Sequence, residues 1–385
     1  YTAVIDSFKA YADGNKIVYA SDYDSAKDKY AVKVSLADSD GTAVGTEQTN
    51  ATGSFDNLEA GKYKITATLS DGTTEKKKVE KTINIKNLDD MSAYLFVHFV
   101  DTQEDATREQ IYFSVSKDGK TWTTLNNKQP YLTSNVGTQG VRDPYILRGE
   151  DGKFFIIATD LSVYNLKNNW TAAAQQGSKS IVVWESSDLV NWSEASLVKI
   201  NNDNAGCTWA PEACYDPEKD EYMVFWASVV SDDSYQKYRI YRSYTKDFKT
   251  FSAPELYIEE PNAVIDTTII DHEGTYYRFT KNEAKSSITM QECTSLSGDW
   301  KDVASYNLGS MTGYEGPTIY KLNGKNEWCL LLDYFSKSKG YKPFVTTDIT
   351  KGEFTADSDF SFDGTYRHGT VMPITQAEYE SLTAE

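Results

Sequence analysis

Five short segments of this chain combine an acidic residue, or a histidine in its place, with an apolar strand. They lie at residues 142–146, 210–213, 264–268, 314–318 and 367–371. The key residues recur roughly every 50 to 70 positions, which is the period expected of a β-propeller blade. Equivalent positions on the innermost strands of a propeller converge on one axis. The spacing therefore predicts four carboxylates and a histidine at the mouth of one funnel, a cluster that favours carbohydrate chemistry.

Three of these carboxylates, Asp143, Asp266 and Glu315, are the predicted catalytic residues. Hydrolysis of a glycosidic bond needs a protonated acid at the leaving oxygen and an ionised carboxylate across the sugar. A third carboxylate nearby separates the two pKa values by like-charge repulsion. Asp-Pro and Glu-Gly-Pro are also ordinary turn starters, so any one of the three alone would indicate only a turn. Their common phase in the repeat predicts a shared role.

Further residues beside the inner strands are predicted to contact a substrate. Trp209 precedes the second inner strand and should face the funnel as a platform for a sugar ring. Trp170 lies in a loop that is able to reach the rim. Glu212 is placed at the same phase as the catalytic residues and either binds sugar hydroxyls or caps a strand. Arg142 and Arg367 either neutralise the acidic cluster or form structural ion pairs.

The segment 276–283 carries several charges on a strand that should be mostly apolar. Either Arg278 or Lys281 would then reach the substrate site. The alternation of the strand favours the other interpretation, in which these charges form an outward polar face.

A second repeat supports a count of five blades. Five acidic turns, each closing on an aromatic residue, alternate with the inner segments, at residues 116–122, 186–192, 245–251, 297–300 and 347–354. Such turns are typical where the two outer strands of a blade meet in a hairpin. The segments 93–99 and 110–115 should complete the fifth blade with the last inner strand. Strands from both ends of the propeller region would then close the ring and remove its open edges.

Residues 1–88 differ from the rest and predict a separate domain, leaving 89–385 for the propeller. The segments 17–20, 30–34 and 63–69 alternate with strand period two, and Gly-containing turns separate them. This pattern is typical of a small β-sandwich of immunoglobulin or fibronectin type. Because it holds no paired carboxylates and no aromatic stripe, a spacer or docking module is favoured over a carbohydrate-binding role.

Composition limits the partners of the chain. The formal charge is −18, so nucleic acid and anionic membranes would be repelled at long range. Aromatic residues make up 13% of the chain, which favours a β-protein before it favours a sugar binder. No apolar run reaches the roughly 18 to 20 residues that a membrane helix needs. The chain begins at Tyr1, and we interpret it as a mature segment of a secreted or cell-surface protein.

The motifs resemble those of glycoside hydrolase family 43. The order Arg-Asp-Pro, Trp-Ala-Pro-Glu, Ile-Asp-Thr, Glu-Gly-Pro and Arg-His-Gly-Thr-Val is similar to that family over about residues 93–376. The resemblance implies a five-bladed β-propeller that inverts the anomeric carbon. It implies Asp143 as general base, Asp266 as the carboxylate that orients and raises the pKa of the acid, and Glu315 as general acid. The third motif has Asp-Thr where many members have Asp-Pro, which leaves the acidic residue in place.

The same resemblance gives the expected substrate and ions. It implies release of α-L-arabinofuranose from plant cell-wall polysaccharide side chains, with β-D-xylosidase or endo-arabinanase activity as alternatives. His368 matches a family histidine near the propeller axis, which often sits by a bound water or calcium ion. No cofactor is required on this interpretation, and a structural calcium near the axis is an open alternative. A sialidase is disfavoured because the inner positions carry carboxylates. A non-catalytic carbohydrate-binding propeller is the remaining alternative.

Overall fold

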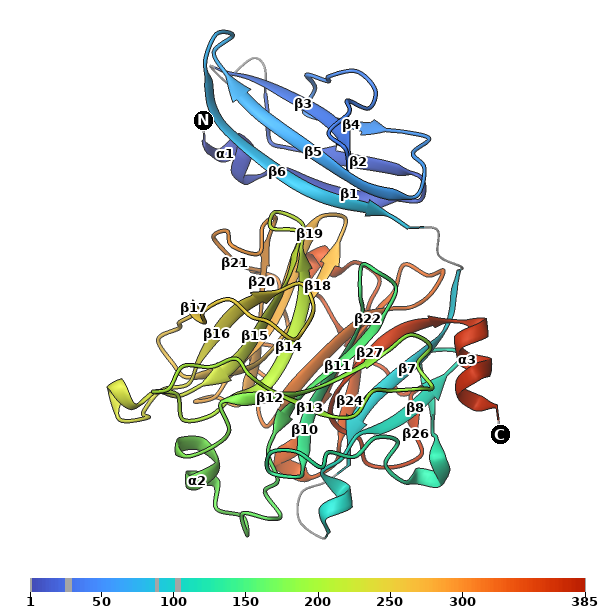
Figure 1. Cartoon of the computed structure of the whole chain (residues 1–385), viewed down its shortest axis with the longest axis vertical. Coiled ribbons are helices and arrows are strands. Elements are labelled where there is room, and N and C mark those ends of the chain that lie inside the picture. Colours follow the sequence, from blue (N-terminus) through green and yellow to red (C-terminus); the bar gives the residue numbers. More distant parts are fainter. Residues whose placement is uncertain (1, 25–29, 87–89, 101–104, 385) are drawn as a thin grey trace.

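The computed structural model of the protein describes residues 2–24, 30–86, 90–100 and 105–384, and its regular structure is mostly β-strand. Two groups of sheets are visible in Figure 1. The first, the N-terminal β-unit, is formed by β1 to β6, and the second, the ring, is formed by five later sheets. Among the described residues, three short α-helices accompany these sheets: α1 (Thr2–Asp6), α2 (Trp170–Gln175) and α3 (Gln376–Thr383).

The N-terminal β-unit consists of two three-stranded antiparallel sheets. One sheet has the order β1 (Lys9–Asp13), β2 (Lys16–Ala20) and β4 (Thr52–Phe55). The other has the order β3 (Ala31–Asp38), β5 (Gly61–Ser70) and β6 (Glu75–Ile85). Their alternate apolar residues, such as Ile17, Val34 and Ile65, form one buried core. The predicted strands at 17–20, 30–34 and 63–69 lie in β2, β3 and β5, apart from residue 30.

Four sheets of the ring are antiparallel and follow the chain order. The first is β10 (Val141–Arg148), β11 (Phe154–Asp160), β12 (Ser180–Ser186) and β13 (Ser196–Lys199). The second is β14 (Trp209–Asp216), β15 (Glu221–Ser228), β16 (Arg239–Thr245) and β17 (Glu255–Ile258). The third is β18 (Val264–His272), β19 (Thr275–Asn282), β20 (Ser287–Cys293) and β21 (Lys301–Asp302). The fourth is β22 (Glu315–Lys321), β23 (Trp328–Asp333), β24 (Tyr341–Thr346) and β25 (Thr355–Ala356).

The fifth sheet joins strands from both ends of the ring region. Its order is β26 (Ser361–Phe362), β9 (Thr121–Thr124), β8 (Tyr112–Ser116), β7 (Met91–Phe99) and β27 (Arg367–Thr375). The predicted pairing of segments 93–99 and 110–115 with the last inner strand is thus confirmed. The parallel pairing of β26 with β9 was not predicted.

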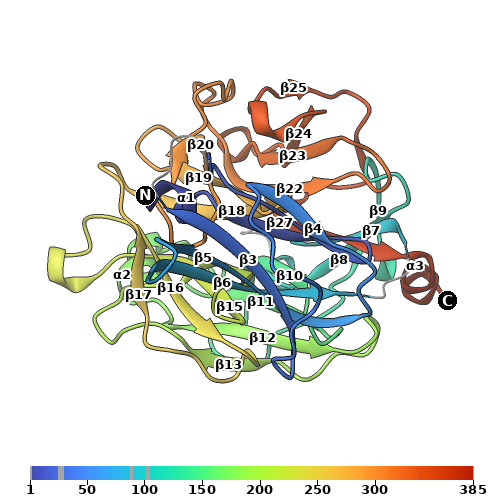
Figure 2. The same ribbon diagram turned by 90° about the horizontal axis from the view of Figure 1, so that it is seen from above.

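The first strands of the four chain-ordered sheets, together with β27, surround the centre of the ring. Each of β10, β14, β18, β22 and β27 contacts the next, and β27 contacts β10. The second strands are buried along most of their length, and their apolar runs fill the space between neighbouring sheets. The view in Figure 2 shows these sheets arranged around the centre.

Ring closure by β27 makes a strong stability prediction. We expect a truncation upstream of Gln376 that removes residues 367–375, and with them β27, to unfold the ring, because β7 and the inner strands β10 and β22 would all lose a buried neighbour. Removal of residues 1–88 should leave the ring folded, because the N-terminal β-unit has its own core. Thermal melts of both truncated proteins check this. A C-terminal truncation that melts like the full chain would contradict the closure argument.

The predicted outer turns are hairpin turns between the third and fourth strands of the sheets. In the turn after β8, Asp118 accepts hydrogen bonds from the backbone N–H groups of Lys120 and Thr121. Asp247 makes the same contacts with Lys249 and Thr250 after β16. In these two turns the acidic residue therefore satisfies backbone donors and is structural.

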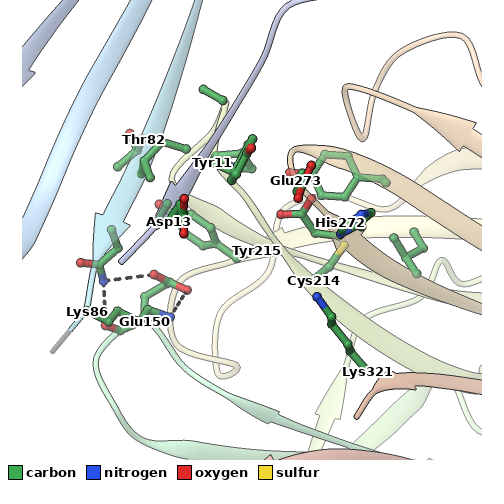
Figure 3. A pocket seen from close by; sticks show the side chains of 18 of the residues that line it. Tyr11, Asp13, Thr82, Lys86, Glu150, Cys214, Tyr215, His272, Glu273 and Lys321 are labelled. Atoms are coloured by element: carbon green, nitrogen blue, oxygen red, sulfur yellow. Dashed lines mark hydrogen bonds and ion pairs between the residues drawn. The ribbon is translucent and has the colours of Figure 1, made fainter. Parts of the chain in front are cut away.

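The N-terminal β-unit packs on the end of the ring where the inner strands finish. Lys81 is 2% exposed, donates to the carbonyl of Thr294 at 2.7 Å and meets Glu218 at 3.3 Å. Lys86 pairs with Glu150 in the turn after β10. A cleft of about 750 Å³ lies at this contact (Figure 3), where Tyr11 of β1 and Tyr215 of β14 are among the lining residues. The predicted catalytic carboxylates lie at the opposite end of the ring, where the inner strands begin.

Candidate active site

All five inner strands carry an irregularity at the same place. Their pairing with the neighbouring strand shifts between Arg142 and Tyr145, Trp209 and Glu212, Ile265 and Thr267, Glu315 and Thr318, and Arg367 and Thr370. Such bulges bend a strand and redirect a side chain. In four of these bulges one residue has a backbone φ of 48° to 51°. These residues are Asp143, Ala210, Asp266 and Gly316. This left-handed backbone is strained for residues other than glycine, typically by about 1–3 kcal/mol.

The bulge explains why two of these positions are acidic and one is glycine. Asp143 and Asp266 accept the strain and direct their carboxylates toward the centre of the ring, where both approach His368. At the matching position of β22, a Cβ atom on Gly316 would lie 2.7 Å from Cγ of His368. Only glycine fits there, because the imidazole of His368 fills the space.

The prediction of one shared phase for all four carboxylates is wrong in detail. Asp143 and Asp266 occupy equivalent bulge positions, but Glu315 precedes its bulge position by one residue. Glu212 follows its bulge position, Ala210, by two residues and is 3% exposed. Its Oε2 atom has no hydrogen-bond partner, and burial raises the pKa of Glu212 to about 8. Glu212 is therefore buried inside the ring, whereas the side chain of Glu315 is 21% exposed.

His368 joins the carboxylates of two sheets. Its Nδ1 atom lies 3.3 Å from Oδ1 of Asp143 and 3.9 Å from Oδ2 of Asp266. Asp143 also accepts a hydrogen bond of 2.9 Å from Thr159 Oγ1, and the backbone N–H of Gly316 donates to Asp266 at 3.0 Å. Both carboxylates are therefore fixed by groups from neighbouring strands.

The surroundings separate the pKa values of the two aspartates. Burial alone would raise the pKa of Asp143, but the hydrogen bond and charge of His368, with the charge of Arg142, lower it below its usual value. Burial raises the pKa of Asp266 to about 6, and the charge of Glu315 adds to this. Asp143 is the more strongly ionised of the two at neutral pH.

His368 should titrate at a much higher pH than the other two histidines of the chain. Burial lowers the pKa of His368, but the carboxylates of Asp266 and Asp143 outweigh it and raise that pKa to about 10. Burial lowers the pKa of His98 to about 4 and lowers that of His272. We expect the imidazole NMR signal of His368 to stay that of the cation through pH 8. Because the folded pKa is raised, its stabilising effect is complete below about pH 6.5 and is lost as the pH rises through about 10. A titration near pH 6.5 would contradict the contacts described for this ring.

Glu315 is held by two cations. Lys281 Nζ lies 2.9 Å from Oε2 of Glu315, and Arg367 Nη2 lies 3.3 Å from Oε1. The favoured interpretation of Lys281, an outward polar face, is wrong, because its side chain is only 3% exposed and points into the site. Lys281 pairs across β18 and β19 with Ile265, the neighbour of Asp266. Arg278 instead packs over Trp300 at 4.3 Å and donates to Gln291 on β20.

Arg142 and Arg367 differ in their surroundings. Arg142 forms a buried ion pair with Glu109, which is 0% exposed, and lies over the ring of Phe99. This is the structural pairing that the sequence left open. Arg367 donates to Asp333 at 2.7 Å and contacts Glu315, so it belongs to the acidic cluster.

Aromatic residues gather beside the start of β14. The ring of Trp209 lies 5.4 Å from that of Tyr238, nearly parallel, and 6.2 Å from that of Trp170, edge to face. Trp170 opens α2, is 43% exposed, and lies 5.3 Å from the guanidinium of Arg142. The two tryptophans that the sequence pointed to are therefore neighbours, and Trp170 offers the more open face.

Sequence reasoning missed Asp333, Glu109 and Thr159. Each holds a predicted site residue: Asp333 accepts from Arg367, Glu109 from Arg142, and Thr159 donates to Asp143. Asp333 ends the apolar run of β23 and is 0% exposed. A polar residue at the end of a buried second strand, or one position before it, is the signal by which Asp333 and Thr159 were recognisable.

The fit of a metal ion to this cluster can be tested against its donors. The described part of the chain has no group of three or more His, Cys, Asp or Glu side chains placed to hold a metal ion. His368 directs Nδ1 at Asp143, so this nitrogen does not fit direct ligation. A calcium ion held through water stays a prediction.

A family model related to glycosyl hydrolase family 43, described as a probable glycosyl hydrolase domain, matches residues 89–380. An α-L-arabinofuranosidase of Bifidobacterium longum subsp. longum is 30% identical over an alignment of 345 residues that covers 76% of this chain and 32% of that protein. This chain thus spans about a third of the length of that relative.

Two solved structures are similar to part of the chain. A thermostable family-43 glycoside hydrolase is 19% identical with a TM-score of 0.43, covering 61% of this chain and 77% of its own. The catalytic domain of a Coprinopsis cinerea family-62 α-L-arabinofuranosidase is 16% identical with a TM-score of 0.42, covering 60% of this chain and 71% of its own. The family model, in contrast, covers most of the chain, and it confirms the resemblance that the motifs indicated. The chain therefore belongs to the glycosyl hydrolases related to family 43.

Proposed function

We propose that this chain is an inverting glycoside hydrolase that releases α-L-arabinofuranose from plant cell-wall polysaccharide side chains. The observation that carries the proposal is the cluster of Asp143, Asp266 and Glu315 on three sheets of the ring, joined through His368 and Arg367. Inversion requires a base and an acid about 6.5–9.5 Å apart, so that a water fits between the base and the sugar.

The contacts of each carboxylate support one role. Asp143, with its lowered pKa, is ionised and accepts the proton of the water that attacks the anomeric carbon. Glu315 gives its proton to the oxygen of the departing group as the old carbon–oxygen bond breaks. Asp266 lies beside both His368 and Gly316 and acts on the charge of Glu315 rather than on the bond. Trp209 and Trp170 would flank the sugar.

The choice of arabinofuranose rests on the name of the Bifidobacterium longum relative. We further propose that residues 89–385 form a five-bladed catalytic propeller and that residues 1–88 form an accessory β-sandwich. The five sheets around one centre and the two three-stranded sheets support this division. The proposed partner is a polysaccharide or oligosaccharide. No helix among the residues placed in the structure is long and apolar enough to cross a bilayer. A secreted or cell-surface location is proposed from the nature of the substrate.

Hydrolysis of two aryl glycosides tests the proposal. The wild-type protein is given 4-nitrophenyl α-L-arabinofuranoside and 4-nitrophenyl β-D-xyloside side by side, and proton NMR follows the first anomer released. We expect turnover of the arabinofuranoside with inversion. Turnover of the xyloside alone would replace the proposed sugar, and a retained anomer would overturn the assignment of Asp143 as base. A matching test with arabinan separates exo from endo cleavage.

A further inference from the structure

Glu315 lies between two cations, and each cation has a second carboxylate. Lys281 meets Oε2 of Glu315 at 2.9 Å and Oε2 of Glu283 at 2.8 Å. On the other side, Arg367 meets Glu315 at 3.3 Å and Asp333 at 2.7 Å. The acid is thus the middle member of a row in which carboxylates and cations alternate.

The position of Lys281 is costly for an ammonium group. Its side chain is 3% exposed and its Nζ atom lies 4.5 Å from the centre of the Phe335 ring. Removing an ammonium from water costs several kcal/mol unless it is paired. Glu315 and Glu283 supply the pairing, and Asp266 contributes at longer range. Glu283 is 39% exposed, so one partner of the buried lysine remains in contact with solvent.

This row suits a carboxyl that must change its charge in every turnover. When Glu315 gains its proton, Lys281 keeps Glu283 and Arg367 keeps Asp333. Neither cation is then left buried and unpaired, which would cost several kcal/mol. Asp266 and Asp333 are further charged groups near Glu315, and like charges repel one another. The cations and the anions therefore act on Glu315 in opposite directions.

We propose that Lys281 is a positioning residue for the acid: it fixes one oxygen of Glu315, and Glu283 limits how strongly it does so. The inference deepens the proposed function and rests on Glu315 being the general acid. Lys281 belongs neither to the bond-breaking groups nor to the core of its sheet. Its role follows from its two carboxylate contacts at the centre of the ring.

Two substitutions should shift the basic limb of the pH profile of kcat/KM in opposite directions. Lys281→Met keeps most of the length of the side chain and removes the cation, so Glu315 should hold its proton to higher pH. We expect the basic limb of kcat/KM to move up by about one pH unit. Glu283→Gln leaves Lys281 with Glu315 as its nearest anion, so the basic limb should move down. Lys281→Arg retains the cation and should restore a limb near that of the wild type. Lys285→Met, an exposed lysine four residues along, is the control and should change nothing.

A second readout does not depend on turnover. The carboxyl carbon of Glu315 is assigned in ¹³C-glutamate-labelled protein by its absence in Glu315→Gln, and its titration is followed by NMR in each variant. Opposite shifts in Lys281→Met and Glu283→Gln support the inference. Equal titration in both, with folded proteins by circular dichroism, overturns it and reduces Lys281 to a packing residue. The two variants could show opposite carboxyl shifts although the wild-type protein hydrolyses neither aryl glycoside. That result would support the coupling of Lys281 to Glu315 and overturn the proposed function.

Discussion

Replacement of Asp143 with asparagine is expected to lower kcat/KM by about 10³-fold on every substrate that the wild-type protein hydrolyses. The amide of asparagine keeps the shape of the side chain but cannot take a proton from water. Loss of a base affects substrates with good and poor leaving groups alike, because the attacking water must be deprotonated in each case. The effect is measured as kcat/KM on an aryl α-L-arabinofuranoside and on an arabino-oligosaccharide.

Asp271→Asn is the matched control for this experiment. Asp271 lies near the other end of β18, accepts a hydrogen bond from the backbone of Gly274, and lines the cleft against the N-terminal β-unit. The control variant should therefore retain the activity of the wild-type protein. Full activity in Asp143→Asn would assign the base to another group and would favour the binding-module alternative if Glu315→Gln were also without effect.

Glu315→Gln should lower activity much more on substrates with a poor leaving group than on substrates with a good one. A 4-nitrophenolate departs with little help from a proton, so we expect a loss of about tenfold or less on the aryl glycoside. A sugar hydroxyl is a poor leaving group, and on the oligosaccharide we expect a loss of about 10³-fold. The basic limb of the pH profile should also disappear on the aryl glycoside, because the group that must be protonated is gone.

The fold of this variant is protected by the contacts around it. Lys281 and Arg367 keep Glu283 and Asp333 as partners, so a melting temperature close to that of the wild type is expected. Glu292→Gln on β20, away from the centre of the ring, controls for the substitution itself. Equal losses on both substrates would show that Glu315 is not the acid.

Much of the ring was predictable from local patterns. Apolar strands alternate with turns whose Asp residues satisfy backbone donors, and this gave the order of the strands. The pairing of β27 with β7 followed from counting the inner and outer signals. The contact of the N-terminal β-unit with the far end of the ring did not follow, because it depends on single residues such as Lys81 that read as ordinary surface lysines.

The site was predictable where it lies on the inner strands and not where it depends on packing between sheets. Asp143 and Asp266 share a bulge position, so a repeat in the sequence marks both. Glu315 lies one residue before the bulge position of its strand, and Glu212 lies two residues after the bulge position of its own. The sequence does not mark where each bulge begins, so these offsets were not predicted. Lys281 and Asp333 come from second strands, and only the closed ring brings them to Glu315 and Arg367. Those contacts join residues with no common motif.

The strand that completes the fifth sheet is also the last strand of the ring to be made during synthesis. While the ribosome is still adding residues, β7 and β8 can pair with each other, but the edge of β7 that receives β27 stays open. An open strand edge is a template for pairing with other chains. The nascent protein therefore exposes the unpaired edge of β7 until residue 375 has left the ribosome. Slow elongation over the region between β9 and β27, or expression without chaperones, should favour aggregation over assembly of the ring.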